Sequence, residues 1–136
     1  MELRRLDHVG VIVDDLDAVG RLLGALGLEA GEALDRDDLR VAFFRCGDAH
    51  VEIIEPLDPA LRRERLGEGQ RARIEHVAFE VHDVQGTLTE LESLGVRPSG
   101  PTLTHEGRSM FWTDPGTSNG IMFQFVQRPE STGDGA

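Results

Sequence analysis

The sequence contains one segment twice, and this repeat constrains the fold more than any other feature. The segment at residues 6–13 reads LDHVGVIV, and residues 74–81 read IEHVAFEV. A constant shift of 68 residues aligns His8 with His76, Val9 with Val77, Val13 with Val81, Asp15 with Asp83, Leu26 with Leu94 and Gly27 with Gly95. A repeat of this length predicts two supersecondary units of about sixty residues each, and not a solenoid of short repeats.

Each copy predicts the same order of elements, a β-α-β-β-β module. In the first copy, a strand over residues 5–13 is apolar on nearly both faces, as is typical of a strand that is buried on both sides. Asp14 and Asp15 are expected to cap an amphipathic helix that ends at Gly27. Further strands are predicted at residues 28–35, 40–46 and 49–55.

The second copy repeats this order after a joint. The joint at residues 56–71 begins with proline, is rich in glycine near its end and predicts a short charged helix. We then expect a strand at 72–81, a helix over 83–94 and strands near 96–103, 107–113 and 120–127. The prediction is a single α+β domain over residues 1–136, with modules at 5–55 and 72–127 and a polar, disordered tail at 128–136.

The composition narrows the classes of function. The formal net charge of −11 disfavours nucleic acid and anionic membranes as partners, because the mean field of the protein would repel both. All 14 basic residues are arginine, so a lysine nucleophile is excluded. A single cysteine, Cys46, allows no internal disulfide and fits a reducing compartment. With no long apolar run and no signal peptide in the sequence, we expect a cytoplasmic protein.

The two repeated strands each carry a histidine at their third position. Alternate residues of a strand share a face, so His8 lies with Gly10 and His76 lies with Ala78. Residues with little or no side chain therefore stand beside both imidazoles. They leave room for a ligand.

Polar side chains also interrupt the closing strand of each module. Glu52 lies within VEII, and Gln124 lies within IMFQFV. Both side chains are costly to bury without a partner. Two imidazoles and two oxygen donors suit a divalent ion such as Zn, Ni, Co, Mn or Fe(II). A single strand histidine is more often a hydrogen-bonded core or surface residue, so the equivalent placement of His8 and His76 is what favours a metal site.

Four segments carry a resemblance to a known family: LDHVGVIVDDLD, VAFFRCGDAHVEIIEP, RLGEGQRARIEHVAFEV and DPGTSNGIMFQFVQ. Residues 5–127 resemble the vicinal oxygen chelate superfamily, which includes glyoxalases, bleomycin resistance proteins and dioxygenases, and most closely its methylmalonyl-CoA epimerase branch. The resemblance implies two β-α-β-β-β modules whose mixed sheets form a cleft around one divalent metal. It places the four ligands on His8, Glu52, His76 and Gln124.

The resemblance also implies an activity. We expect a metal-dependent epimerase of 2-methylmalonyl-CoA or a similar acyl-CoA, which acts through a metal-stabilised enolate. One alternative is a glyoxalase I-like lyase or isomerase, or a dioxygenase, that uses the same metal site. Another is a metal-free protein that binds an antibiotic or another small molecule. A homodimer is what the family implies.

Two positions depart from the family pattern. Gln124 stands where relatives commonly have glutamate, and an amide can ligate through its oxygen but cannot accept a proton as a base. The second base of the family precedes the VAFF strand, where Arg36 aligns nearest to it and Asp37 is the candidate replacement. Glu52 is then expected to ligate the metal, to act as a base, or both. With one carboxylate and three neutral ligands, a divalent site would keep a net charge of about +1.

A group of arginines lies within the joint and just after it. It comprises Arg62, Arg63, Arg65, Arg71 and Arg73. A CoA ester would need such a patch for its phosphates. A solvated helix that pairs these arginines with Glu64 and Glu68 is an equally good interpretation.

Overall fold

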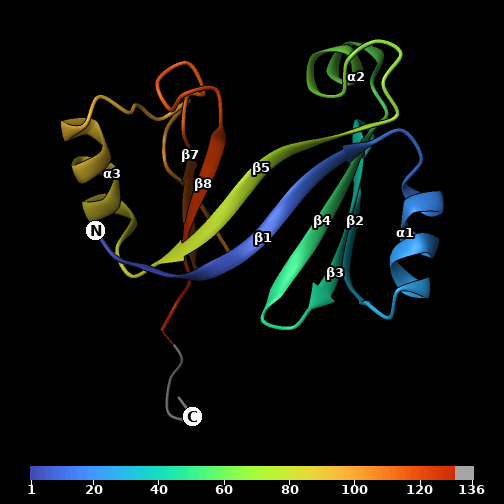
Figure 1. Cartoon of the computed structure of the whole chain (residues 1–136), viewed down its shortest axis with the longest axis horizontal. Helices are drawn as coiled ribbons and strands as arrows, with labels where there is room; N and C mark the ends of the chain where they lie inside the picture. Colours follow the sequence, from blue (N-terminus) through green and yellow to red (C-terminus); the bar gives the residue numbers. More distant parts are fainter. Residues whose placement is uncertain (131–136) are drawn as a thin grey trace. The chain divides into compact units, whose positions relative to one another are not determined.

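The computed structural model describes residues 1–130 and follows the duplicated order of elements (Figure 1). The first five elements are β1 (Leu3–Val13), α1 (Leu16–Ala25), β2 (Glu29–Asp35), β3 (Leu39–Cys46) and β4 (Ala49–Pro56). The helix α2 (Pro59–Arg65) follows, and then come β5 (Ala72–Val81), α3 (Val84–Ser93), β6 (Leu103–His105), β7 (Arg108–Trp112) and β8 (Met122–Gln127). The predicted fold class, two β-α-β-β-β modules in one chain, is confirmed.

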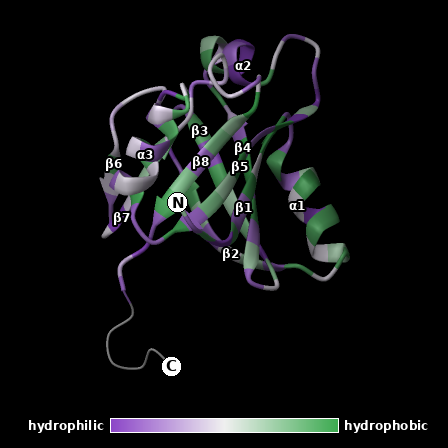
Figure 2. Cartoon of the chain, turned by 60° about the vertical axis from the view of Figure 1, so that its left-hand side comes forward, coloured by the Kyte–Doolittle hydropathy of each residue, from purple (hydrophilic) through white to green (hydrophobic). Residues whose placement is uncertain are grey.

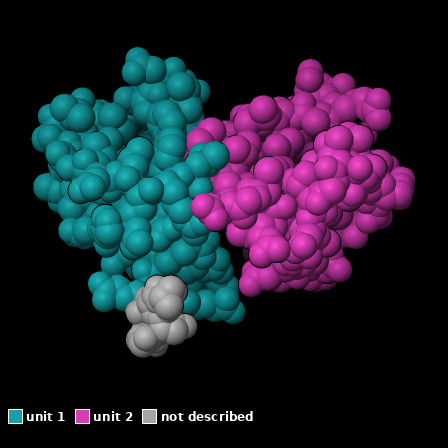
Figure 3. Space-filling model, turned by 60° about the horizontal axis from the view of Figure 1, so that its bottom comes forward, with its two compact units in different colours: residues 1–6, 78–136 teal, residues 7–77 magenta. Residues whose placement is uncertain are grey.

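The chain forms two compact units, which Figure 3 shows in different colours. One unit comprises residues 7–77, and the other comprises residues 1–6 together with residues 78–130 of the described chain. The strands β1 and β5 each contribute to both units, because the boundary falls within them.

In the unit of residues 7–77, the sheet has a helix on each face. Strand β3 pairs antiparallel with β2 and with β4, and β4 pairs parallel with β1. One face carries Val13, Phe44 and Ile53, which pack against Leu16 and other apolar residues of α1. In Figure 2, α1 shows both green and purple turns, as expected for a helix with one buried side.

The opposite face of the same sheet carries the candidate site. Ile12, Val41 and Ile54 form a second apolar cluster there, with Leu61 and Leu66 from α2 and its C-terminal end. Since alternate strand residues share a face, His8 lies on the same face as Ile12, and Glu52 on the same face as Ile54. The helix α2 therefore covers the part of the sheet next to these two side chains.

In the other unit, α3 packs on one face of its sheet. Strand β7 pairs antiparallel with β6 and β8. The core of this unit contains Val81, Val84, Phe111 and Phe125, with Leu88 and Leu91 of α3 packed against them.

The C-terminal ends of α1 and α3 are alike, as the repeat predicts, but their N-terminal caps differ. Gly27 and Gly95 follow the C-terminal ends of α1 and α3 with φ values of 97° and 87°, in the left-handed region that favours glycine. Asp15 caps α1 by accepting a hydrogen bond from the Ala18 amide at 3.1 Å. Asp83 is the N-cap residue of α3, but its side chain makes no capping bond.

The strand predicted at residues 96–103 is wrong. The structure has only an isolated bridge between Pro98 and Thr113, and β6 begins at Leu103. Pro98 and Pro101 have no backbone N–H to donate to a neighbouring strand, which explains why the strand does not form. Of the tail predicted to be disordered, residues 128–130 are described without helix or strand, and residues 131–136 lie outside the described part. Within residues 1–130, no helix is long and apolar enough to cross a membrane.

Candidate metal centre

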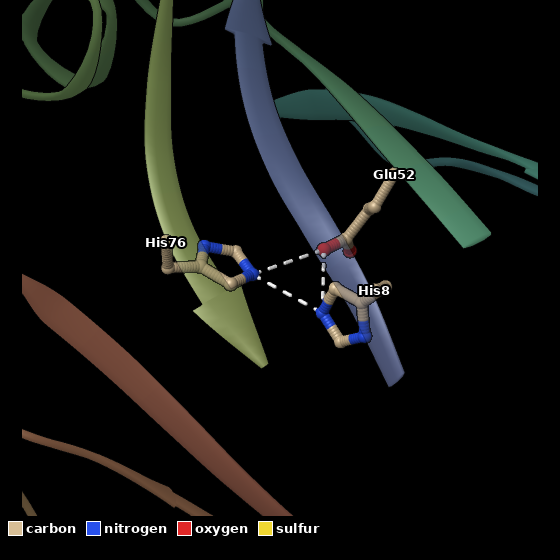
Figure 4. Close-up of side chains that lie close together, drawn as sticks. All are labelled: His8, Glu52 and His76. Carbon is tan, nitrogen blue, oxygen red and sulfur yellow. Dashed lines mark hydrogen bonds and ion pairs between the residues drawn. The ribbon is translucent and has the colours of Figure 1, made fainter. Parts of the chain in front are cut away.

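Three side chains from three strands meet in the unit of residues 7–77 (Figure 4). His8 comes from β1, Glu52 from β4 and His76 from β5. The two Nε2 atoms lie 3.2 Å apart, and Glu52 Oε1 lies 3.4 Å from His8 Nε2 and 3.3 Å from His76 Nε2. One donor atom of each residue therefore points toward a common centre.

The spacing of these donor atoms fits a divalent ion. Ligands about 2.1 Å from an ion lie roughly 3.0–3.4 Å from one another at angles between octahedral and tetrahedral. All three distances of the triangle are within or at the edge of this range. Within residues 1–130, no other three histidine, cysteine or acidic side chains bring their ligand atoms within 4.8 Å of one another.

Strand register and one glycine explain how the three residues meet. In the parallel pairing of β1 with β4, Gly10 lies opposite Glu52. A Cβ atom at Gly10 would lie 2.1 Å from Cε1 of His76 and 2.5 Å from its Nε2. The imidazole of His76 thus occupies the space that a side chain at position 10 would fill. The sequence indicated a small neighbour that leaves room for a ligand, and this room holds the ring of His76.

Each imidazole is also bound by an acidic side chain on its other nitrogen. His8 Nδ1 lies 2.7 Å from Asp7 Oδ2, and His76 Nδ1 lies 3.1 Å from Glu75 Oε1. Sequence analysis missed both carboxylates. A signal was present, because the shift that aligns the histidines also aligns these two acidic residues.

The acidic neighbours change the pKa values of the cluster. Burial lowers the pKa of His8, but its hydrogen bonds with Asp7 and Glu52 outweigh burial and raise this pKa to about 9. Burial raises the pKa of Glu52, but hydrogen bonds with His76 and His8 outweigh burial and lower it to about 2. The pKa of His76 is raised, because hydrogen bonds with Glu52 and Glu75 outweigh the lowering by burial. The cluster therefore favours positive charge, whether protons or a cation supply it.

Gln124 lies in the other unit, on β8, and its surroundings fit an oxygen donor. The side chain is buried, and its Nε2 donates a hydrogen bond to Met110 Sδ at 3.4 Å. Its Oε1 is buried and has no hydrogen-bond partner within the described part of the chain. A buried amide oxygen without a partner is costly, which is consistent with a ligand that the protein alone does not supply.

The candidate second base does not join the three-residue cluster. Asp37 lies on the exposed turn between β2 and β3, before β3 begins at Leu39. Glu52 pairs with Phe43 in the middle of β3. Arg36, on the same turn, forms two hydrogen bonds with Asp38.

The structure gives partners to three of the five arginines near the joint. Arg62 forms an ion pair with Asp14, and Arg65 forms two hydrogen bonds with Glu75. Arg73 donates to the backbone oxygen of Arg65. Arg63 and Arg71 are exposed and make no ion pair with any residue between 1 and 130.

Comparison with known proteins assigns the chain to a family. The sequence profile of the Glyoxalase/Bleomycin resistance protein/Dioxygenase superfamily matches residues 7–111. The chain belongs to this superfamily.

One relative and several solved structures are similar to this chain over most of its length. The uncharacterised protein YqjC of Bacillus subtilis (strain 168) is 28% identical over 134 residues, which cover 92% of this chain and 93% of YqjC. A hypothetical protein from Bacillus halodurans C-125 is 25% identical, with a TM-score of 0.76 and coverage of 95% of this chain and 97% of that chain. The methylmalonyl-CoA epimerase of Mycobacterium tuberculosis is 24% identical and shares the fold, with a TM-score of 0.80 and coverage of 93% and 89%.

Proposed function

We propose that this protein is a divalent-metal-dependent epimerase of 2-methylmalonyl-CoA or a similar acyl-CoA thioester. The observation that carries the proposal is the cluster of His8, Glu52 and His76, whose donor atoms lie 3.2–3.4 Å apart. Membership of the superfamily and the fold shared with a methylmalonyl-CoA epimerase support this reaction class.

Epimerisation of such a substrate requires a base and a group that stabilises the negative charge of the enolate, which a metal site would supply. Epimerisation removes the C2 proton, which lies between a thioester and a carboxylate, and returns a proton to the opposite face of C2. A divalent ion would act as a Lewis acid for the substrate oxygens that gain negative charge when this proton leaves. His8, Glu52 and His76 would hold the ion, and Gln124 is our candidate for a fourth, oxygen ligand.

Glu52 is our first candidate for the proton acceptor. Its side chain is 16% exposed, compared with 8% for His8 and 3% for His76, so it is the most accessible member of the cluster. Its lowered pKa keeps it ionised, which a metal ligand and a proton acceptor both require, and makes it a weaker base than an unperturbed glutamate. We retain Asp37 as the candidate for a second base, which would act on the opposite face of C2.

Deuterium exchange tests the proposal directly. Metal-loaded protein is incubated with 2-methylmalonyl-CoA in D2O, and incorporation at C2 is followed by mass spectrometry. We expect exchange with the wild type and a loss of about 10²–10⁴-fold with Glu52→Gln, which keeps an oxygen ligand but cannot act as a base. Metal content is measured in parallel to show that the variant remains loaded.

The other outcomes identify other functions. Metal-loaded protein that catalyses no exchange would contradict the epimerase and leave a glyoxalase-like isomerase or a dioxygenase as the function to test. Protein that binds no divalent metal would contradict every metal-dependent reaction and favour small-molecule sequestration.

For the second base, Asp37→Asn should slow exchange by about 10²-fold or more. The exposed control Glu32→Gln on β2 should not slow exchange. Equal exchange rates for the two variants would remove Asp37 from the mechanism.

A further inference from the structure

We propose that Asp7 and Glu75 are positioning residues of the metal centre, and that Arg65 of α2 acts on His76 through Glu75. This inference rests on the proposed metal centre but not on the identity of the substrate. Asp7, Glu75 and Arg65 would thus have a role at the site although they lie outside the cluster of His8, Glu52 and His76.

The first observation is that the same contact occurs in both copies of the repeat. In each copy, the acidic residue that precedes the histidine reaches its Nδ1 atom, at 2.7 Å for Asp7 and at 3.1 Å for Glu75. Both histidines direct Nε2 toward the other imidazole and toward Glu52. Successive residues of a regular strand face opposite sides, so these contacts do not follow from strand geometry alone.

The second observation concerns which nitrogen remains for a cation. An ionised carboxylate can only accept a hydrogen bond, so it retains the proton on the Nδ1 atom that it contacts. The lone pair of Nε2 is then the one available to a metal, and the orientation of the ring is fixed. Carboxylates in this position also make a ligating imidazole more basic, and their loss typically weakens metal binding by about 10–100-fold.

The third observation is the contact between Glu75 and α2. Arg65 Nη2 donates to Glu75 Oε1 at 2.7 Å, and Arg65 Nε donates to Glu75 Oε2 at 2.9 Å. Such a two-point contact fixes both the position and the plane of a carboxylate. Glu75 is 6% exposed and Arg65 is 27% exposed, so solvent screens this pair less than a surface ion pair.

These contacts connect α2 to His76. Glu75 Oε1 accepts from both Arg65 and His76, so a change in the position of Arg65 alters the group that orients the imidazole. The backbone oxygen of Arg65 also accepts a hydrogen bond from Arg73 Nη1 at 2.8 Å. The structure therefore assigns Arg65 to the metal centre, and not to the patch available for CoA phosphates.

Zinc affinity and a residue-specific NMR signal test the proposal. Zinc dissociation constants are measured by competition with a chromophoric chelator for the wild type, Glu75→Gln and Arg65→Lys. We expect about 10–100-fold weaker binding for Glu75→Gln. Arg65→Lys keeps the charge but loses the two-point contact, so a smaller loss is expected. The matched controls Glu68→Gln and Arg63→Lys change exposed residues of the same region and should bind zinc as the wild type does.

The exchangeable Nδ1–H signals of the zinc-loaded protein separate positioning from general stability. Glu75→Gln should shift the His76 signal and speed its exchange with water, while the His8 signal stays unchanged. Asp7→Asn should have the reverse effect. Wild-type zinc affinity in Glu75→Gln, or equal changes of both signals in each variant, would overturn the proposal.

The outcome also separates this inference from the proposed reaction. A wild-type protein that binds no zinc would overturn the metal centre and the positioning roles together. Zinc binding that depends on Glu75 and Arg65, in a protein that catalyses no exchange at C2, would support the inference and contradict only the epimerase.

Discussion

At the scale of single residues, Gly10 determines whether the imidazole of His76 can reach the other ligands. A methyl group at this position would overlap the ring, with its carbon 2.1 Å from Cε1. Because the ring is also held by Glu75, it cannot move without losing that contact. We expect Gly10→Ala to weaken divalent-metal binding by about 100-fold or more, as the loss of a ligand would.

The measurement for Gly10→Ala is metal content after dialysis, together with the dissociation constant for zinc. The matched control is Gly31→Ala on β2, where the nearest atom to a new Cβ lies at an ordinary 3.4 Å. Both substitutions place alanine in a strand, so a difference between them reports on His76. Wild-type affinity in Gly10→Ala would show that the position of His76 does not govern metal binding.

The neutral side chain of Gln124 leads to a second prediction. A carboxylate at position 124 would bring a divalent site from a net charge of about +1 to zero, and each added ligand charge strengthens the attraction for the cation. We expect Gln124→Glu to lower the zinc dissociation constant by roughly tenfold. The control is Gln127→Glu, the same change three residues further along β8. Unchanged or weaker zinc retention in Gln124→Glu would count against Gln124 as a ligand.

The sequence predicted the three clustered residues because two simple rules apply to them. The repeat makes His8 and His76 equivalent, and strand alternation identifies Glu52 as a polar residue in an apolar run. Neither rule could predict Arg65, because its contact with Glu75 depends on how α2 packs against the sheet. Strand alternation alone also places Asp7 on the face opposite to His8, so it does not predict their contact.

At the scale of secondary-structure elements, the closing strand of each module also binds the start of its own helix. Glu55 Oε1 accepts a hydrogen bond from the Leu16 amide at 3.0 Å, and Gln127 Oε1 accepts one from the Val84 amide at 2.9 Å. In each module this residue lies three positions after the candidate ligand, Glu52 or Gln124. The two closing strands are thus equivalent within their own units. This equivalence supports Gln124 as the counterpart of Glu52.

The start of α3 should depend more on this contact than the start of α1 does. Asp15 caps α1 through its side chain, whereas Asp83 makes no such bond at α3. We expect Gln127→Ala to lower the free energy of unfolding by about 1 kcal/mol, because the Val84 amide loses its acceptor. Urea unfolding followed by circular dichroism measures this effect. Gln85→Ala, an exposed change in the first turn of α3, is the control, and an equal loss there would contradict the capping role of Gln127.

The order and type of these elements could be predicted because apolar periodicity and stop signals coincide in both copies. Gly27 and Gly95 end their helices as predicted, because both adopt the positive φ values that glycine tolerates. The error at residues 96–103 arose in a segment that contains Pro98, Gly100 and Pro101, which disfavour a regular strand. The absence of a side-chain cap at Asp83 could not be predicted either, since the repeat aligns it with Asp15, which does cap its helix.

At the scale of the whole molecule, metal binding should contribute to stability. The three clustered residues belong to three different strands, and an ion bound to all of them would favour the folded arrangement over the unfolded chain. A ligand present at 100 times its dissociation constant stabilises the state that binds it by about 2.7 kcal/mol. For a chain of this size, such a gain corresponds to a rise of roughly 5–10 °C in melting temperature.

Thermal unfolding with and without zinc measures this contribution for the wild type, His8→Ala and His76→Ala. We expect zinc to raise the melting temperature of the wild type and to have little effect on the two variants, because each lacks one of the imidazole ligands. The matched controls are His82→Ala and His105→Ala, which remove exposed histidines and should respond to zinc as the wild type does. If all five proteins responded alike, zinc would be acting at the surface. If none responded, the cluster would be a hydrogen-bonded core and not a metal centre. A response that disappears only with His8 and His76 requires the two copies of the repeat to bind one ion together.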